Sequence, residues 1–122
     1  MRYDPTVDPD PAQWLAAPEA ERLVAVRQHH ELAGHPPEGA QAHAAIHTVV
    51  ETQLAEEYAV TQATLRRLVH DGLDRHDAIH AIGSVVADEI LDMLKLKRAY
   101  EPEAYARKLA ALTAAAWRRG LQ

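Results

Sequence analysis

The sequence predicts an all-α protein, and three observations support this fold class. No segment shows the alternation of polar and apolar residues that is typical of a strand. Helix start and stop signals recur along the 122 residues, and in the two longest predicted helices the apolar residues share one face. We therefore expect one domain, residues 1–122, folded as a helical bundle of four main helices plus a short N-terminal helix.

Proline, aspartate and glycine residues define the expected elements in order. Residues 1–10 are acidic and Pro-rich and form an extended arm, and Asp10 then caps a short helix, Pro11–Ala17. The other helices are expected at Glu19–Ala33, Ala40–Tyr58, Thr61–Asp71, Arg75–Arg98 and Glu103–Arg119. Gly72 has the position of a residue that ends a helix, and Asp74 has the position of an N-cap.

Composition excludes several classes of function. The net charge of −5 argues against nucleic-acid binding, which needs a strongly basic surface. No apolar run approaches the roughly 20 residues that span a bilayer, and the N-terminus lacks the apolar region of a secretory signal. We expect a cytoplasmic protein without a membrane partner. Cysteine is absent, so thiolate chemistry and thiolate metal ligands are excluded.

The pentapeptide His-x-Ala-Ile-His occurs twice, at His43–His47 and at His76–His80. Each copy follows a glycine-containing turn and a new helix start, and each precedes a pair of valines. This internal repeat predicts two helical hairpins related by pseudo-symmetry, which would bring the two histidine-bearing helices face to face.

A helical projection places all four motif histidines, His43, His47, His76 and His80, within the apolar stripes of their helices. An imidazole buried without a hydrogen-bond partner costs about 1–3 kcal/mol. These side chains are therefore expected to share hydrogen bonds or to ligate a metal. Gly83 lies at the centre of the same face, where it would allow another helix or a bound species to approach closely.

Histidines at positions i and i+4 of a helix are a common way to present two neutral imidazoles to a metal ion. We expect a divalent transition metal, Zn, Fe or Mn, bound by His43, His47, His76 and His80. Glu51 and Asp88 lie toward the edges of the two stripes, and each is a candidate ligand, orienting group or general base. His30 is a candidate fifth ligand, because it shares a face with apolar residues of its helix.

The first interpretation is a metal-binding protein, which could be a metal-dependent enzyme of unknown reaction. Two further interpretations stay open. The histidines could form a buried hydrogen-bonded seam in a non-enzymatic structural or interaction module. They could also form a pH-sensitive interface, because histidine titrates near neutrality. Under the first two interpretations, the Pro-rich arm and the Ala-rich segment Ala110–Trp117 could serve a homodimer.

The stretch Ala40–Leu94 resembles an uncharacterised bacterial family of small, helical, His-rich proteins. The resemblance rests on His-x-x-Ile-His-x-x-Val-Glu-x-Gln at residues 43–53 and on Gly-Leu-Asp-Arg-His-x-Ala-Ile-His-Ala-Ile-Gly-Ser-Val at residues 72–85. It implies no known activity. A looser similarity, to hemerythrin-like di-iron bundles, implies metal ligation by His47, Glu51 and the pair His76 and His80, with His30 as an early lone ligand. Those bundles also use ligands from a last helix, whereas residues 103–119 contain no histidine.

Overall fold

The computed structural model describes residues 2–32 and 40–120, with the backbone alone at residues 30–32, 40 and 41, and the described part is entirely helical without a strand. Its seven helices are α1 (Pro11–Ala16), α2 (Glu19–Leu32), α3 (Ala40–Ala55), α4 (Ala59–His70), α5 (Arg75–Leu96), α6 (Pro102–Ala111) and α7 (Ala114–Gly120). The predicted all-α class is confirmed. The predicted end of the second helix at Ala33 lies outside the described residues.

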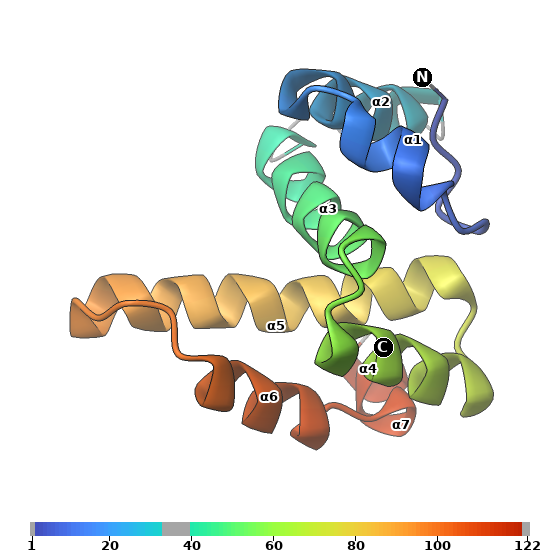
Figure 1. Cartoon of the computed structure of the whole chain (residues 1–122). Coiled ribbons are helices and arrows are strands. Elements are labelled where there is room, and N and C mark those ends of the chain that lie inside the picture. Colours follow the sequence, from blue (N-terminus) through green and yellow to red (C-terminus); the bar gives the residue numbers. More distant parts are fainter. Residues whose placement is uncertain (1, 33–39, 121–122) are drawn as a thin grey trace.

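Helix α3 connects the two parts of the molecule. It packs against α1, α2 and α5, while α4 and α6 contact α5 and each other (Figure 1). In Figure 1, α5 runs across the middle of the molecule, with α3 on one side and α4, α6 and α7 on the other. The chain therefore forms two arms that meet where α3 crosses α5.

Each arm has its own cluster of buried side chains. In the smaller cluster, Tyr3 and Trp14 pack with Val26 and Ala44. The larger cluster surrounds α5 and includes Ile79, Ile82, Tyr105 and Leu109, among others. Helix α3 contributes Ala44 to the first cluster and Val50 to the second, so it carries the histidine motif His43–His47 close to the junction of the two arms.

The predicted signals around the start of α5 are confirmed. Gly72 has a φ of +104°, which strongly favours glycine, and the N–H groups of Gly72 and Leu73 donate to the carbonyls of Val69 and Leu68. The Asp74 carboxylate accepts the Asp77 N–H at 2.7 Å. These contacts fix the point at which α5 begins, and with it the orientation of His76 and His80.

The expected single helix Glu103–Arg119 is wrong, because the structure divides this segment into α6 and α7. Leu112 is extended, with φ −74° and ψ 128°, and Thr113 Oγ1 accepts the Ala116 N–H at 3.0 Å. A threonine hydroxyl can replace the missing backbone acceptor at a new helix start. The predicted helix Ala40–Tyr58 also ends early, at Ala55, because Glu57 adopts a φ of +60°.

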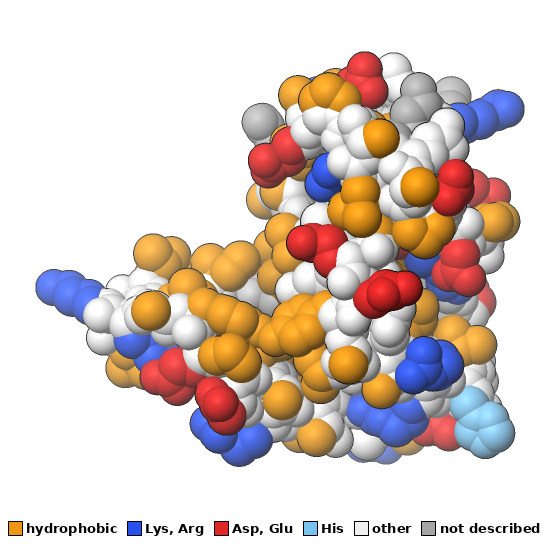
Figure 2. All heavy atoms as spheres, in the orientation of Figure 1, with side chains coloured by type: hydrophobic (Ala, Val, Ile, Leu, Met, Phe, Trp, Pro, Cys, Tyr) orange, Lys and Arg blue, Asp and Glu red, His pale blue; other side chains and the backbone are white. Residues whose placement is uncertain are grey.

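The second half of α5 extends beyond α3 and keeps much of its apolar surface accessible. Figure 2 shows hydrophobic side chains over this part of the molecule. The exposed large hydrophobic residues of α5 are Ile90, Leu91, Leu94 and Leu96. In the described part of the chain, no helix combines the length and the hydropathy needed to cross a bilayer.

Candidate metal centre

The packing of α3 against α5 brings the two histidine motifs together. The ring centroids of His43 and His80 lie 4.7 Å apart, those of His47 and His80 5.2 Å, and those of His47 and His76 5.6 Å. Gly83 allows this approach, since a Cβ atom at that position would lie only 3.0 Å from Ile46 Cγ2 of α3. The close contact expected at this glycine is therefore made by α3.

The four motif histidines differ in burial, which the helical projection did not predict. His47 is 2% exposed, His76 and His80 are half-buried, and His43 is exposed. The expectation of four buried rings is thus wrong for His43. Its motif begins only three residues into α3, at one edge of the contact with α5.

Three of the motif histidines, His43, His47 and His80, bring ring nitrogens close enough together that they could hold a metal ion, and we call them the three-histidine group. One ring nitrogen from each lies within 4.8 Å of the other two, and the Nε2 atoms of His43 and His80 are 3.2 Å apart. Two nitrogen ligands of a tetrahedral ion, each about 2.0–2.1 Å from the metal, lie about 3.3–3.4 Å apart. The contact between His43 and His80 already has the separation of two such ligands.

His76 and His29 pack beside this group. The His76 ring stacks on His47 with an interplanar angle of 8° and meets His80 edge-on at 4.3 Å. His29 of α2 lies edge-on to both His76 and Tyr3, at 5.8 and 6.0 Å. His29 was not among the predicted site residues, because the helical projection places it off the apolar stripe of its own helix. The side chain of His30 lies outside the described residues.

Tyr3, in the N-terminal arm, connects the three-histidine group to Glu51. Its O–H donates to Glu51 Oε2 at 2.5 Å, and its oxygen lies 3.1 Å from His47 Nε2. Burial, together with the neighbouring Glu51 carboxylate, raises the pKa of Tyr3 well above its ordinary value, so the phenol stays protonated at neutral pH. Because the single phenol proton goes to Glu51, His47 Nε2 donates to the Tyr3 oxygen. In neutral His47 the lone pair is then on Nδ1.

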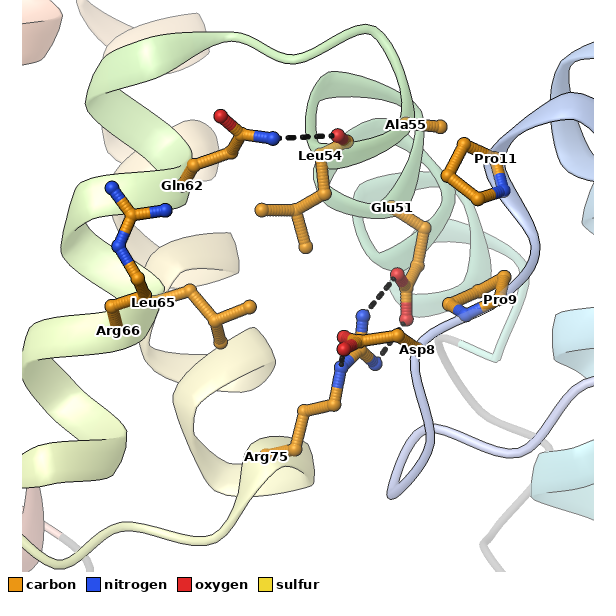
Figure 3. A pocket seen from close by; sticks show the side chains of 10 residues that line it. All are labelled: Asp8, Pro9, Pro11, Glu51, Leu54, Ala55, Gln62, Leu65, Arg66 and Arg75. Carbon is orange, nitrogen blue, oxygen red and sulfur yellow. Dashed lines mark hydrogen bonds and ion pairs between the residues drawn. The ribbon is translucent and has the colours of Figure 1, made fainter.

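Glu51 is held by Arg75, and Figure 3 shows this pair beside the N-terminal arm. Arg75 donates to the two Glu51 oxygens at 2.8 and 2.7 Å, and its Nε donates to Asp8 at 2.7 Å. The Glu51 side chain has no exposed surface. The bidentate contact with Arg75 therefore balances the charge of Glu51. Glu51 is linked to His47 through the Tyr3 hydroxyl.

Asp88 lies on another side of α5. Lys108 of α6 contacts its carboxylate at 3.0 Å, and the Asp88 side chain is 62% exposed. The same Lys108 also binds Glu89 and Asp92. Asp88 is thus part of an ionic cluster between α5 and α6 and is not brought to the three-histidine group. The helical projection had placed it toward the edge of the apolar stripe.

A cavity of about 400 Å³, which we call the histidine cavity, adjoins the group. All three members of the three-histidine group line it. Its other walls are mainly small or apolar: Ala42, Ile46, Ile79, Gly83, Ala87 and Trp117. Trp117 comes from α7, so the unexpected break before α7 positions one wall of this cavity.

Sequence reasoning missed Tyr3, Arg75 and Trp117. Tyr3 is only 5% exposed. The one signal for this burial was that Tyr3 is the single aromatic residue of a polar, Pro-rich arm. Arg75 immediately precedes the second motif but carries no local sign of its long-range partner. No family model, curated protein or solved structure matches this chain.

Proposed function

We propose that the protein binds a divalent transition-metal ion, Zn, Fe or Mn, through His43, His47 and His80. The observation that carries the proposal is the convergence of three ring nitrogens from two helices within 4.8 Å. Imidazole nitrogen suits each of these metals. Small rotations of the side chains would reduce the longest separation to that of ligands on one ion.

The contacts around His47 support this proposal. Histidine ligands commonly donate the N–H of their second nitrogen to an oxygen that fixes the ring orientation. Here the Tyr3 oxygen lies at 3.1 Å from His47 Nε2 and is itself bonded to Glu51. Of the roles considered for Glu51, these contacts favour that of an orienting group.

The remaining candidates have different roles in the proposal. His76 packs against His47 and His80 and would limit the rotation of both rings. The Asp88 carboxylate serves an ion pair with Lys108. We infer that the repeated motif is functional, because its two copies would supply the three proposed ligands and the His76 ring that packs beside them.

A metal-dependent enzyme is the more specific form of the proposal. Catalytic zinc sites have three protein ligands and an open position, whereas structural sites have four. A zinc ion in such a site lowers the pKa of bound water to about 7. The histidine cavity beside the three-histidine group would give a substrate access to that open position.

Elemental analysis and calorimetric zinc titration of protein purified without a tag test the proposal. We expect one ion per chain, which His47→Ala or His80→Ala removes. The matched control is His70→Ala, which changes an exposed histidine at the end of α4 and should leave binding unchanged. Wild-type protein without stoichiometric metal, and with a thermal midpoint unaffected by EDTA, would contradict the proposal.

The hydrogen-bonded seam is a second candidate, and one contact favours it. The distance of 3.2 Å between the Nε2 atoms of His43 and His80 also suits an N–H···N hydrogen bond. In that case the histidines would specify the packing of α3 on α5 without an ion. The seam predicts that His80→Ala destabilises the protein equally with and without added zinc.

A further inference from the structure

The histidine cavity points to a ligand class: we propose that it binds a small monocarboxylate with an apolar tail, whose carboxylate faces the metal. This inference rests on the metal site proposed above. It goes further because it specifies charge, polarity and size for the molecule that would occupy the cavity.

The charge of the ligand follows from the charges around the three-histidine group. Three neutral imidazoles leave the double charge of a bound ion uncompensated, and among the described residues none that lines the cavity is acidic. The buried carboxylate of Glu51 lies nearby, but its charge is already balanced by the bidentate contact with Arg75. An anionic oxygen from the ligand would supply the missing negative charge next to the ion.

The tail follows from the walls of the histidine cavity. Ile46 and Ile79 provide branched apolar surface, and the small residues Gly83 and Ala87 line the cavity along α5. Apart from the histidines, the polar side chain among the described walls is Ser84. A volume of about 400 Å³ lies in the range of pockets for small organic ligands, in which a few polar groups orient a mainly apolar molecule. A second charged group on the ligand would have no counter-charge among the described lining residues, so we expect a monocarboxylate to bind better than a dicarboxylate or an amino acid.

Ala42 and Ala45 of α3 provide a matched pair of positions for the test. Both are exposed alanines on the same helix, but Ala42 lines the histidine cavity and Ala45 does not. Ala42→Phe would add a bulky ring at the rim of the cavity without changing a histidine. Ala45→Phe adds the same ring elsewhere on α3.

The experiment first titrates zinc into each protein and then titrates hexanoate into the zinc-loaded form by calorimetry. Hexanoate is expected to bind at least about tenfold more tightly than acetate, which has no tail, because each buried methylene adds affinity. It is also expected to bind at least about tenfold more tightly than hexanol, which has no charge. Ala42→Phe should weaken hexanoate binding about tenfold while zinc binding is retained, and Ala45→Phe should have no effect.

Three other outcomes would each contradict a particular part of the proposal. Normal zinc binding with equal affinities for hexanoate and acetate would overturn the apolar tail, and equal affinities for hexanoate and hexanol would overturn the carboxylate. Either result would leave the metal site intact. An absence of zinc binding in the first titration would overturn the metal site and this inference together.

Discussion

Glu51 and Asp8 contact the same arginine from very different surroundings. Both carboxylates lie 2.7 Å from Arg75, but the Glu51 side chain is fully buried, whereas that of Asp8 is 82% exposed. Removal of one partner from a buried ion pair leaves an uncompensated charge, while exposed pairs are screened by water. The two residues therefore separate the effect of burial from that of distance.

We expect Glu51→Ala to lower the free energy of unfolding by about 3–5 kcal/mol, because it leaves the Arg75 guanidinium without its buried counter-charge. Asp8→Ala is expected to cost about 0–1 kcal/mol. Urea denaturation of the two variants measures both values. Equal losses in the two proteins would show that Arg75 does not depend on Glu51 in the way that the contacts indicate.

Among the elements, the turn between α4 and α5 has the strictest local requirement. Gly72 has a φ of +104°, and a Cβ atom there would lie 2.5 Å from Arg118 Nη2 of α7. Gly120, at the end of α7, has no atom within 4 Å of an equivalent Cβ among the described residues. These two glycines therefore differ in both backbone conformation and available space.

Gly72→Ala is expected to destabilise the protein by about 1–2 kcal/mol, the usual cost of a left-handed conformation for a residue with a side chain. Gly120→Ala provides the comparison and should change the thermal midpoint little. Thermal unfolding followed by circular dichroism measures both. A Gly72→Ala protein as stable as wild type would mean that the turn can adopt another conformation.

Local sequence signals predicted where the helices begin and end better than they predicted the contacts between distant residues. Asp74 and Gly72 identified the start of α5, because a cap and a left-handed turn depend only on near neighbours. The break at Leu112 was missed because its Thr113 cap competes with an alanine-rich segment that favours a continuous helix. Helical periodicity grouped the motif histidines, but it could not foresee that Tyr3 would bring Glu51 to His47 or that Lys108 would hold Asp88.

At the scale of the whole molecule, an ionic cluster fastens the extended half of α5 to the segments that follow it. Glu89 is buried and binds both Arg98 and Lys108. Hydrogen bonds from Arg98 and then Lys108 lower the pKa of Glu89 from its usual 4.5 to about 2. The expected homodimer stays a prediction. The Pro-rich N-terminal arm and α7, which were expected to serve it, pack on their own chain through the buried residues Tyr3 and Ala114.

The lowered pKa of Glu89 predicts how stability depends on pH. The stabilisation is fully present above the usual carboxyl pKa of 4.5 and is lost as the pH falls toward 2, where the folded protein takes up the proton. Glu89→Gln should therefore flatten the decrease in thermal midpoint between these pH values. The exposed Glu56→Gln is the control and should retain the wild-type profile; identical profiles for all three proteins would contradict the prediction.

The two buried clusters meet at α3, and this arrangement has a thermodynamic consequence. The proposed ligands His43 and His47 are on α3, and the proposed ligand His80 is on α5, so an ion would bind only while α3 and α5 remain docked. By mass action, such an ion stabilises the docked state by an amount that grows with its free concentration. The cooperativity between the two arms would then be set by the metal supply as well as by the amino-acid sequence.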